Sequence, residues 1–376
     1  MFEEFDYIYS NRLDYAQSWK NRTGNKVVGY FCTYVPEEIL YAADILPIRI
    51  LGSHEIQDVT EPHIHSGMFC PFCRDVLAEG LQGKYEFLDG LMIAQSCLHI
   101  RQAFFSWQIH KPVDFMYYLP HPMHVQSPRA IPYLKAELGK FKKAIEDWTG
   151  KQITDDDLRR GIETMNKNRR LMHQVYELRK KEKPPLTGGE AMKMVVASQL
   201  SDKEEHSRLV EDMLPDLTNR NLNRVTGVRL MMLGSETDDF PFIEMVENLG
   251  ATFVIEDHCT GSRYFWVDVD EEKARLDPLE TIAERYVKRV PCPSKDWPER
   301  SRGQHLLDLA RGYNVEGAII IQQKFCDPHE CDIPALRGLL EANGIPCYFL
   351  EFDVTVPIGQ LQVRMEAFLE QLTLNI

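Results

Sequence analysis

Short apolar runs alternate with helical patterns near the N-terminus of the chain. Residues 1–25 carry aromatic and aliphatic side chains at helical spacing and predict a helix, and 37–43 and 97–107 predict two more. Strand–helix–strand alternation at this spacing is typical of a parallel sheet. We therefore predict a parallel α/β unit in this part of the chain. Its expected strands are 27–32, 47–51, 87–94 and 113–119.

The same rhythm returns in the last part of the chain. Helices are expected at 240–249 and 333–342, and Gly344 lies where a helix commonly ends in the left-handed conformation. The short runs around these helices are rich in Val, Ile, Leu, Met and Phe, which is typical of buried parallel strands. The sequence thus predicts a second parallel α/β unit. Its expected strands are 228–233, 252–255, 318–321 and 348–351.

The segment between the two units has a helical pattern. Thr154 and Asp157 have the spacing of a capping box, in which each side chain satisfies a free amide at a helix N-terminus. Apolar residues then recur at helical spacing from Leu158 to Val175, among Lys and Arg side chains that we interpret as a solvated face. The predicted organisation is an N-terminal α/β domain over 1–127, a helical insert over 128–222 and a C-terminal α/β domain over 223–376.

The chain has 43 Lys and Arg against 57 Asp and Glu residues, which gives a formal net charge of −14. A field of this sign repels nucleic acids and anionic membranes, so we expect neither as a partner. No stretch approaches the roughly 18 uninterrupted apolar residues of a membrane span. The acidic start lacks the basic and apolar regions of a signal peptide. We expect a cytoplasmic protein.

Nine cysteines are the unusual feature of the composition. An odd number of cysteines in a reducing compartment argues against a disulfide framework. Metal binding or catalysis is a better use for some of them, and the others are expected to be small core residues. They are Cys32, Cys70, Cys73, Cys97, Cys259, Cys292, Cys326, Cys331 and Cys347.

Several of these cysteines follow predicted strands. Ligands of open parallel sheets bind outside the carboxyl ends of the strands, and Cys97 and Cys326 each follow one, in different units. Cys32 and Cys259 also come at or just beyond strand ends. Cys70 precedes a proline that fits the first turn of a helix, where the helix dipole favours the thiolate form that metals bind.

Two cysteine pairs suggest other sites. Cys70 and Cys73, together with Cys326 and Cys331, could form a four-thiolate zinc site, but about 250 residues separate the pairs, unlike compact zinc motifs. Cys70-x2-Cys73 could be a thioredoxin-like motif, but that motif should follow a strand. The sequence contains no phosphate-binding loop, G-x-G-x-x-G or H-E-x-x-H motif. Nucleotide binding by this chain is therefore not expected.

Five groups of short motifs extend from about residue 26 to residue 360. The first is GYFCTYVPEE at 29–38 with LPIR at 46–49. The others are Cys70-x3-Arg74, Gln95-Ser-Cys97-x3-Arg101, HCTGSRYF at 258–265, and FCDP at 325–328 with GIP at 344–346 and LEFD at 350–353. In this combination the sequence resembles the 2-hydroxyacyl-CoA dehydratase / benzoyl-CoA reductase family.

The resemblance implies a particular fold and cofactor. Catalytic subunits of that family have two Rossmann-like domains and hold one [4Fe–4S] cluster between them through three cysteines. By motif these are Cys70, Cys97 and Cys326. Three protein ligands leave one iron open to water, sulfide or substrate. Cys73 and Cys331 depart from the family pattern, so we expect neither to be a ligand.

The segment from 57 to 104 is most similar to the smaller catalytic subunit of ATP-dependent benzoyl-CoA reductases. This implies two-electron reduction of the aromatic ring of benzoyl-CoA to a cyclic diene. The implied partners are a paired homologous catalytic subunit and ATP-hydrolysing iron–sulfur activator subunits. The alternatives are a subunit of a 2-hydroxyacyl-CoA dehydratase, which eliminates water by a radical route, and a non-catalytic metal-binding or electron-relay subunit.

A catalytic subunit also needs groups that hold and protonate its substrate. We expect the hydroxyls of Thr33 and Tyr34 and the guanidinium of Arg49 to bind the thioester or a phosphate. His99 and Tyr34 are the candidate proton donors. The alternative is that Thr33 and Tyr34 only shape the loop after the first strand.

Overall fold

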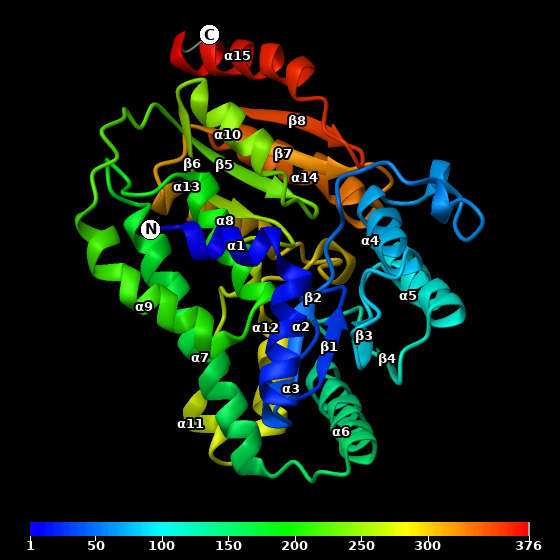
Figure 1. The fold of residues 1–376 in the computed structure, drawn as a ribbon. Coiled ribbons are helices and arrows are strands. Elements are labelled where there is room, and N and C mark those ends of the chain that lie inside the picture. The colour runs from blue at the N-terminus through cyan, green and yellow to red at the C-terminus, as the bar shows by residue number, and fades with distance from the viewer. Residues whose placement is uncertain (375–376) are drawn as a thin grey trace.

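The computed structural model describes residues 1–374 and contains two four-stranded parallel sheets (Figure 1). The first sheet consists of β1 (Val27–Tyr30), β2 (Leu46–Arg49), β3 (Gly90–Ala94) and β4 (Phe115–Leu119). The second consists of β5 (Val228–Gly234), β6 (Ala251–Asp257), β7 (Gly317–Gln323) and β8 (Cys347–Phe352). The predicted class, two Rossmann-like parallel-sheet units, is confirmed, and each expected strand is present to within a few residues.

Both sheets have the same strand order. The order is β2-β1-β3-β4 in the first sheet and β6-β5-β7-β8 in the second. In each sheet the second strand in sequence lies on one side of the first strand, and the third and fourth strands lie on its other side. The reversal lies between β1 and β3 in the first sheet and between β5 and β7 in the second. Such a switch point opens a crevice at the carboxyl ends of the strands.

Helices cover both faces of the first sheet. Val27 and Leu91 face α4 (Pro71–Leu81) and α5 (Leu98–His110), while Val28 and Met92 face the opposite core. Because side chains of a strand alternate between faces, residues buried on both sides give the continuous apolar runs seen in the sequence. The helices on the opposite face include α3 (Glu37–Ala42) and α6 (Ala130–Thr149).

The helical insert continues with α7 (Asp155–Leu178), α8 (Gly188–Leu200) and α9 (Lys203–Asn219). The predicted capping box at the start of α7 is confirmed: the Thr154 hydroxyl accepts a hydrogen bond from the Asp157 amide, and the Asp157 carboxylate accepts one from the Thr154 amide. Thr187 and Glu190 form a second box at the start of α8.

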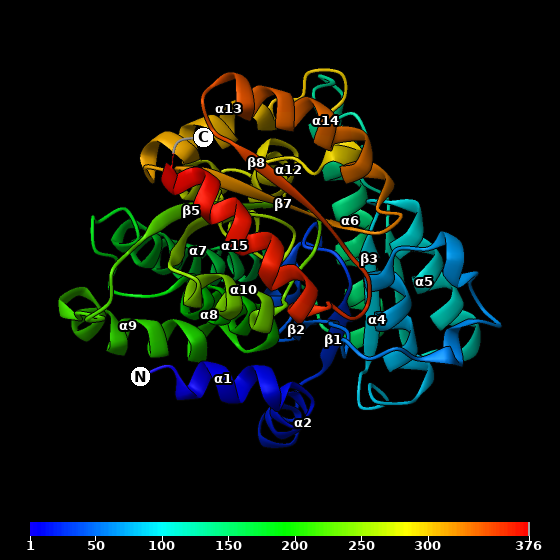
Figure 2. The ribbon, with the colours of Figure 1, turned by 90° about the horizontal axis from the view of Figure 1, so that it is seen from above.

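Segments of the two halves of the chain cross over. Residues 1–25 form two helices, α1 (Glu3–Ser10) and α2 (Arg12–Thr23), and not the single helix expected. Helix α1 packs against α8, in the core of the second sheet. Conversely, α12 (Pro278–Lys288) packs against α6 in the core of the first sheet. Figure 2 shows α1 beside α8. The predicted domain boundaries at 127 and 222 stay predictions.

The remaining helices belong to the C-terminal part. Helix α14 begins at the residue after Cys326, six residues earlier than expected, because Asp327 and Pro328 suit a first helical turn. Within residues 1–374, no helix is long and apolar enough to cross a membrane. The other elements are α10 (Phe240–Asn248), α11 (Glu271–Ala274), α13 (Arg302–Gly312), α14 (Asp327–Ala342) and α15 (Ile358–Leu374).

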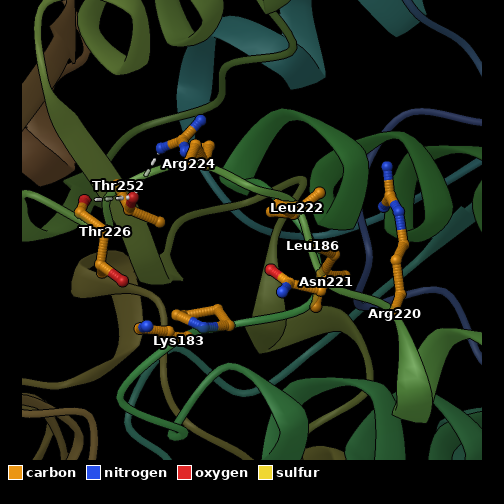
Figure 3. A pocket seen from close by; sticks show the side chains of 9 residues that line it. Lys183, Leu186, Arg220, Asn221, Leu222, Arg224, Thr226 and Thr252 are labelled. Atoms are coloured by element: carbon orange, nitrogen blue, oxygen red, sulfur yellow. Dashed lines mark hydrogen bonds between the residues drawn. The ribbon is translucent and has the colours of Figure 1, made fainter.

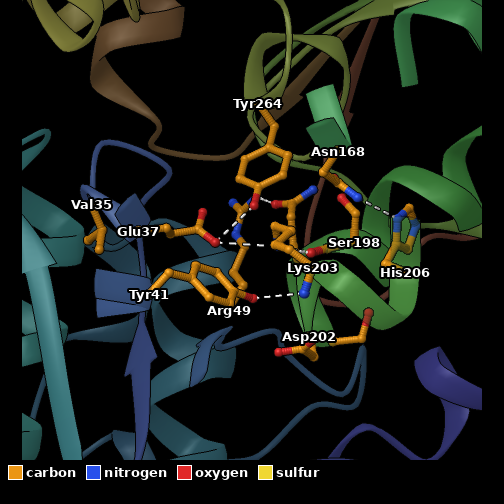
Figure 4. Close-up of polar contacts among 12 residues, drawn as sticks. Val35, Glu37, Tyr41, Arg49, Asn168, Ser198, Asp202, Lys203, His206 and Tyr264 are labelled. Atoms are coloured by element: carbon orange, nitrogen blue, oxygen red, sulfur yellow. Dashed lines mark hydrogen bonds and ion pairs between the residues drawn. The ribbon is translucent and has the colours of Figure 1, made fainter. Parts of the chain in front are cut away.

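One buried carboxylate ties the three parts of the chain together (Figure 4). Glu37 of α3 accepts a hydrogen bond of 2.9 Å from the hydroxyl of Tyr264 in the C-terminal part, and it lies 3.4 Å from the ammonium of Lys203 in the insert. The Lys203 amide also donates to the hydroxyl of Tyr41. All of these side chains are buried, so the contacts fix how the insert and the two sheets meet.

Candidate functional site

A cavity lies where the carboxyl edges of the two sheets meet. Residues at the switch points of both sheets line this cavity, so the carboxyl ends of the strands of the two sheets face each other across it. From the first sheet come Phe31, Cys32 and Thr33 after β1 and Ser96 and Cys97 after β3; from the second come Ser235 and Glu236 after β5 and Gln323 at the end of β7.

Seven of the nine cysteines line this cavity. The other two do not: Cys331 is exposed on α14, and Cys347 lies at the first position of β8. All nine are free thiols. Thiols from both sheets and from two loops therefore converge on one space although they are far apart in sequence. The seven are Cys32, Cys70, Cys73, Cys97, Cys259, Cys292 and Cys326.

The three cysteines predicted to hold a cluster share one local geometry. Cys70, Cys97 and Cys326 are the N-cap residues of α4, α5 and α14, and none of the three side chains caps its helix with a hydrogen bond. Pro71 at the first position of α4 is confirmed. The positive ends of three helix dipoles thus point toward the three thiols, which stabilises the thiolate form.

The thiols also interact with one another. Hydrogen bonds from the thiols of Cys326 and Cys73 lower the pKa of Cys70 well below its usual value, and a hydrogen bond from Cys73 lowers the pKa of Cys97. Burial instead raises the pKa of Cys73. The structure therefore brings Cys70, Cys97 and Cys326 together, and it adds Cys73, which was not expected among them.

The arrangement does not suit a single metal ion. Across the described part of the chain, no three His, Cys, Asp or Glu side chains converge closely enough to hold one ion. The zinc alternative is not supported because Cys331 lies outside the cavity, exposed on α14. The thioredoxin-like alternative is not supported either, since Cys70 follows a short helical turn and not a strand. A cubane has a different requirement, because each thiolate binds its own iron.

Several polar atoms in the cavity wall have no partner among residues 1–374. They are Nε of Arg49, Oε1 of Glu236, Oε1 of Gln323 and both ring nitrogens of His329. Buried polar groups are normally hydrogen-bonded, and leaving one unpaired costs about 1–3 kcal/mol. Atoms of this kind gathered around one cavity indicate that it accommodates a bound group.

Glu236 is a residue of the cavity wall that the sequence reasoning missed. Its carboxyl group lines the cavity and is 6% exposed. Burial, and next the charge of Asp238, raise the pKa of Glu236 well above its usual value, which favours the protonated form of the carboxyl. The signal was available, because Glu236 lies three residues beyond the end of the predicted strand 228–233, but the strand-end rule was applied only to cysteines.

Two of the residues expected to bind the substrate lie in the cavity wall and already make hydrogen bonds within the protein. Arg49 and Thr33 line the cavity. Arg49 is 2% exposed and donates through Nη1 to Gln199 (2.6 Å) and to the carbonyl of Cys259 (2.9 Å), so it also joins the insert to the C-terminal part. The Thr33 hydroxyl accepts a hydrogen bond from Arg289.

Neither expected proton donor lines the cavity. The Tyr34 hydroxyl accepts a hydrogen bond from the Cys292 amide, burial raises its pKa, and Arg289 and Lys295 lie over its ring. Nδ1 of His99 accepts a hydrogen bond of 3.1 Å from the Cys70 amide. His99 therefore positions the loop that carries a predicted ligand, and the roles of both residues in proton transfer stay predictions.

In a second pocket, the arginine side chains already have partners within the protein (Figure 3). The Arg220 guanidinium pairs with Glu190 at 2.7 Å. Arg224 donates to the carbonyl of Ala251 and to the hydroxyl of Thr252. Because these cations are neutralised or hydrogen-bonded, the cysteine-lined cavity is the stronger candidate for the site.

The fold and the site define an α/β protein with a thiol-lined cavity between two facing switch points. The sequence matches the family model described as 2-hydroxyglutaryl-CoA dehydratase, D-component, over residues 32–372. The chain belongs to this family, as its motifs predicted.

Several characterised proteins are similar to the chain over nearly their whole length. A subunit of benzoyl-CoA reductase from Thauera aromatica is 26% identical, over 98% of this chain and 94% of its own. The (R)-phenyllactyl-CoA dehydratase beta subunit of Clostridium sporogenes is 25% identical, over 99% and 98%. The beta subunit of (R)-2-hydroxyglutaryl-CoA dehydratase of Acidaminococcus fermentans is 24% identical, over 99% of both chains. These relatives are subunits of enzymes named for acyl-CoA substrates.

Proposed function

We propose that the cavity holds a [4Fe–4S] cluster on Cys70, Cys97 and Cys326, and that the chain is a catalytic subunit acting on an acyl-CoA thioester. The observation that carries the proposal is the convergence of three helix N-cap thiols on one buried cavity. The donor set fits, since iron–sulfur clusters are held by thiolates. The unpartnered polar atoms of the cavity wall support a bound group.

When bound, such a cluster supplies single electrons at low potential, down to about −700 mV. The chain's own residues would contribute the rest of the site. Phe31, Phe72 and Ile100 make its wall apolar, which excludes water from a reactive intermediate. Arg49 places a cation in that wall, and the carboxyl of Glu236, whose pKa is raised by burial, is the proposed proton source that faces the same space.

Within this family we propose that the reaction is the ATP-dependent two-electron reduction of benzoyl-CoA to a cyclic diene-carboxyl-CoA, which makes the enzyme an oxidoreductase. The similarity to the benzoyl-CoA reductase of Thauera aromatica and the apolar wall with two phenylalanines support this choice. The proposed partners are a homologous catalytic subunit and ATP-hydrolysing iron–sulfur activator subunits. The proposed location is the cytoplasm, where nine free thiols stay reduced.

The cluster is tested by changing its proposed ligands. Cys70→Ser, Cys97→Ser and Cys326→Ser should each remove about four irons and four sulfides per chain from anaerobically purified protein. Cys331→Ser, which changes an exposed thiol outside the cavity, is the matched control and should leave the iron content unchanged. Full iron content in all three ligand variants would refute the assignment.

The reaction is tested on the assembled complex. With benzoyl-CoA, the reductase should consume ATP in proportion to the diene formed. A 2-hydroxyacyl-CoA dehydratase, the alternative that the relatives from Clostridium and Acidaminococcus represent, recovers its electron and needs ATP only to start. Many turnovers of a 2-hydroxyacyl-CoA per ATP, with no reaction of benzoyl-CoA, would establish the dehydratase instead.

A further inference from the structure

His54, in the segment after β2, has an unusual backbone conformation. Its φ is 61°, in the left-handed region that few non-glycine residues adopt. The Asp75 carboxylate holds this turn, because it accepts hydrogen bonds from the amides of Ser53 (3.0 Å) and His54 (2.8 Å). It also lies so close to Gly52 that a Cβ there would be 2.2 Å from it. Such strain persists where the surrounding structure enforces it, commonly at functional sites.

The turn directs the ring of His54 toward a buried carboxylate. Nε2 of His54 lies 2.8 Å from Oδ1 of Asp238, which belongs to the loop between β5 and α10. The side chain of His54 is 33% exposed, whereas that of Asp238 is 3% exposed. The other oxygen of Asp238 accepts a hydrogen bond of 3.2 Å from the Tyr9 hydroxyl. A histidine that water can reach is thus hydrogen-bonded to a carboxylate inside the protein.

Asp238 adjoins the cavity through Glu236. Glu236 precedes it by two residues in the same loop and lines the cavity. The two carboxyl groups lie near enough for the charge of Asp238 to act on Glu236. Oε1 of Glu236 has no hydrogen-bond partner among residues 1–374. An imidazole and two carboxyl groups, all able to exchange protons, therefore follow one another from the surface to the cavity.

The proposed reaction needs such a series. Two-electron reduction of an aromatic ring also takes up two protons, so a donor in the cavity must be reprotonated for the next turnover. Glu236 is 6% exposed, and Phe31 and Phe72 make the cavity wall apolar, which limits direct access of bulk water to its carboxyl. We propose that His54, Asp238 and Glu236 form a relay that carries protons from the surface to the cavity. The inference rests on the proposed function for the role of Glu236 as proton source.

The relay moves protons and no electrons. Glu236 gives its proton to the reacting group and becomes a carboxylate. The imidazolium of His54 then gives its Nε2 proton to Asp238, and Asp238 passes a proton to Glu236. Neutral His54 finally takes up a proton from water. The starting state of the ring fits this sequence, because the charge of Asp238 raises the pKa of His54 to about 10 and the ring is protonated at neutral pH.

The experiment compares steady-state turnover of the assembled complex with the wild-type chain, His54→Asn or Tyr9→Phe. Asparagine tolerates the left-handed backbone at this position. His54→Asn should lower kcat about tenfold or more, and added imidazole, a small proton donor, should restore it as its concentration rises. Tyr9→Phe removes the other hydrogen bond to Asp238 and is the matched control. It should keep the wild-type kcat and show no response to imidazole beyond that of the wild type.

A second readout needs no turnover. Infrared spectroscopy of the full chain, purified without oxygen and transferred to D₂O, follows deuterium uptake by the Glu236 carboxyl. The band of this carboxyl is assigned by its absence in Glu236→Gln. Uptake should be slower in His54→Asn than in the wild type and unchanged in Tyr9→Phe.

The outcomes separate the relay from the proposed function. A loss of kcat in His54→Asn that imidazole does not restore, with unchanged deuterium uptake, would show that His54 has only a structural role and would overturn the relay. Wild-type kcat in His54→Asn would overturn it as well. No turnover of benzoyl-CoA by the wild-type complex would refute the proposed reaction, and the deuterium uptake would still decide for or against the relay.

Discussion

At the scale of single residues, the carboxyl of Glu236 is the group in the cavity best suited to deliver a proton. It is buried, it lines the cavity, and one of its oxygens lacks a partner within the described chain. Tyr34 and His99, expected for this role from sequence, have hydrogen-bonding tasks outside the cavity lining. A carboxylic acid kept neutral by its surroundings can act as a general acid at neutral pH.

Glu236→Gln should therefore lower kcat of the assembled complex by about a hundredfold or more while leaving the iron content unchanged. The amide keeps the size of the side chain and removes its acidic proton. The measurement is steady-state turnover together with iron analysis of the same preparation. Wild-type kcat in the variant would exclude Glu236 as the proton donor.

A second residue-scale prediction concerns His54, whose ring lies 2.8 Å from Asp238. The charge of Asp238 raises the pKa of His54 from 6.5 to about 10. The folded state thus binds this proton more tightly than the unfolded state. The stabilisation is complete below pH 6.5 and is lost as the pH rises toward 10.

The difference in unfolding free energy between the wild type and His54→Asn should accordingly shrink between about pH 6 and about pH 9.5. Asparagine is chosen because His54 has a φ of 61°, which Asn tolerates. Urea unfolding of the apo-protein at both pH values measures the difference. An identical difference at the two pH values would contradict the assigned ion pair.

At the scale of elements, the inner strands β1, β3, β5 and β7 were predictable because they are buried on both faces and read as continuous, mostly apolar runs. The starts of α4 and α7 were also predictable, from Pro71 and from the Thr154 capping box. The local sequence pattern could not predict which residues that are distant in sequence lie close together in the fold. No periodicity relates Cys32 to Cys292, and only the folded chain places both in one cavity wall.

Helix packing supplies an element-scale prediction. Helix α7 approaches α3 so closely that a Cβ at Gly161 would lie 2.1 Å from the carbonyl oxygen of Glu38. Gly161→Ala should therefore lower the free energy of unfolding by about 1–3 kcal/mol, because backbone must move to make room. Chemical denaturation measures the change.

Gly139→Ala is the matched control, since it also lies within a helix, α6. Its nearest neighbour would be a Leu279 methyl group at 3.8 Å, an ordinary contact. This variant should be more stable than the wild type by about 0.5–1 kcal/mol, because alanine favours the helix. Equal effects of the two substitutions would contradict the close packing of α7 on α3.

At the scale of the whole molecule, we expect the chain to act as one part of a larger enzyme. Its relatives are named as subunits, and its sequence has no phosphate-binding loop. Isolated chain supplied with benzoyl-CoA, ATP and a chemical reductant should therefore show no turnover. Adding the paired catalytic subunit and the activator should restore it. Turnover by the isolated chain would contradict the proposed division of labour.

The exchange of helices between the two halves has a consequence for biosynthesis. Helix α12 covers the first sheet, α1 packs in the core of the second, and the cavity thiols extend from Cys32 to Cys326. While the ribosome is still making the C-terminal half, the first sheet lacks part of its cover and the cavity lacks one wall. The proposed cluster should therefore be inserted only after the chain is nearly complete, and an N-terminal fragment ending before α12 should neither fold stably nor retain iron.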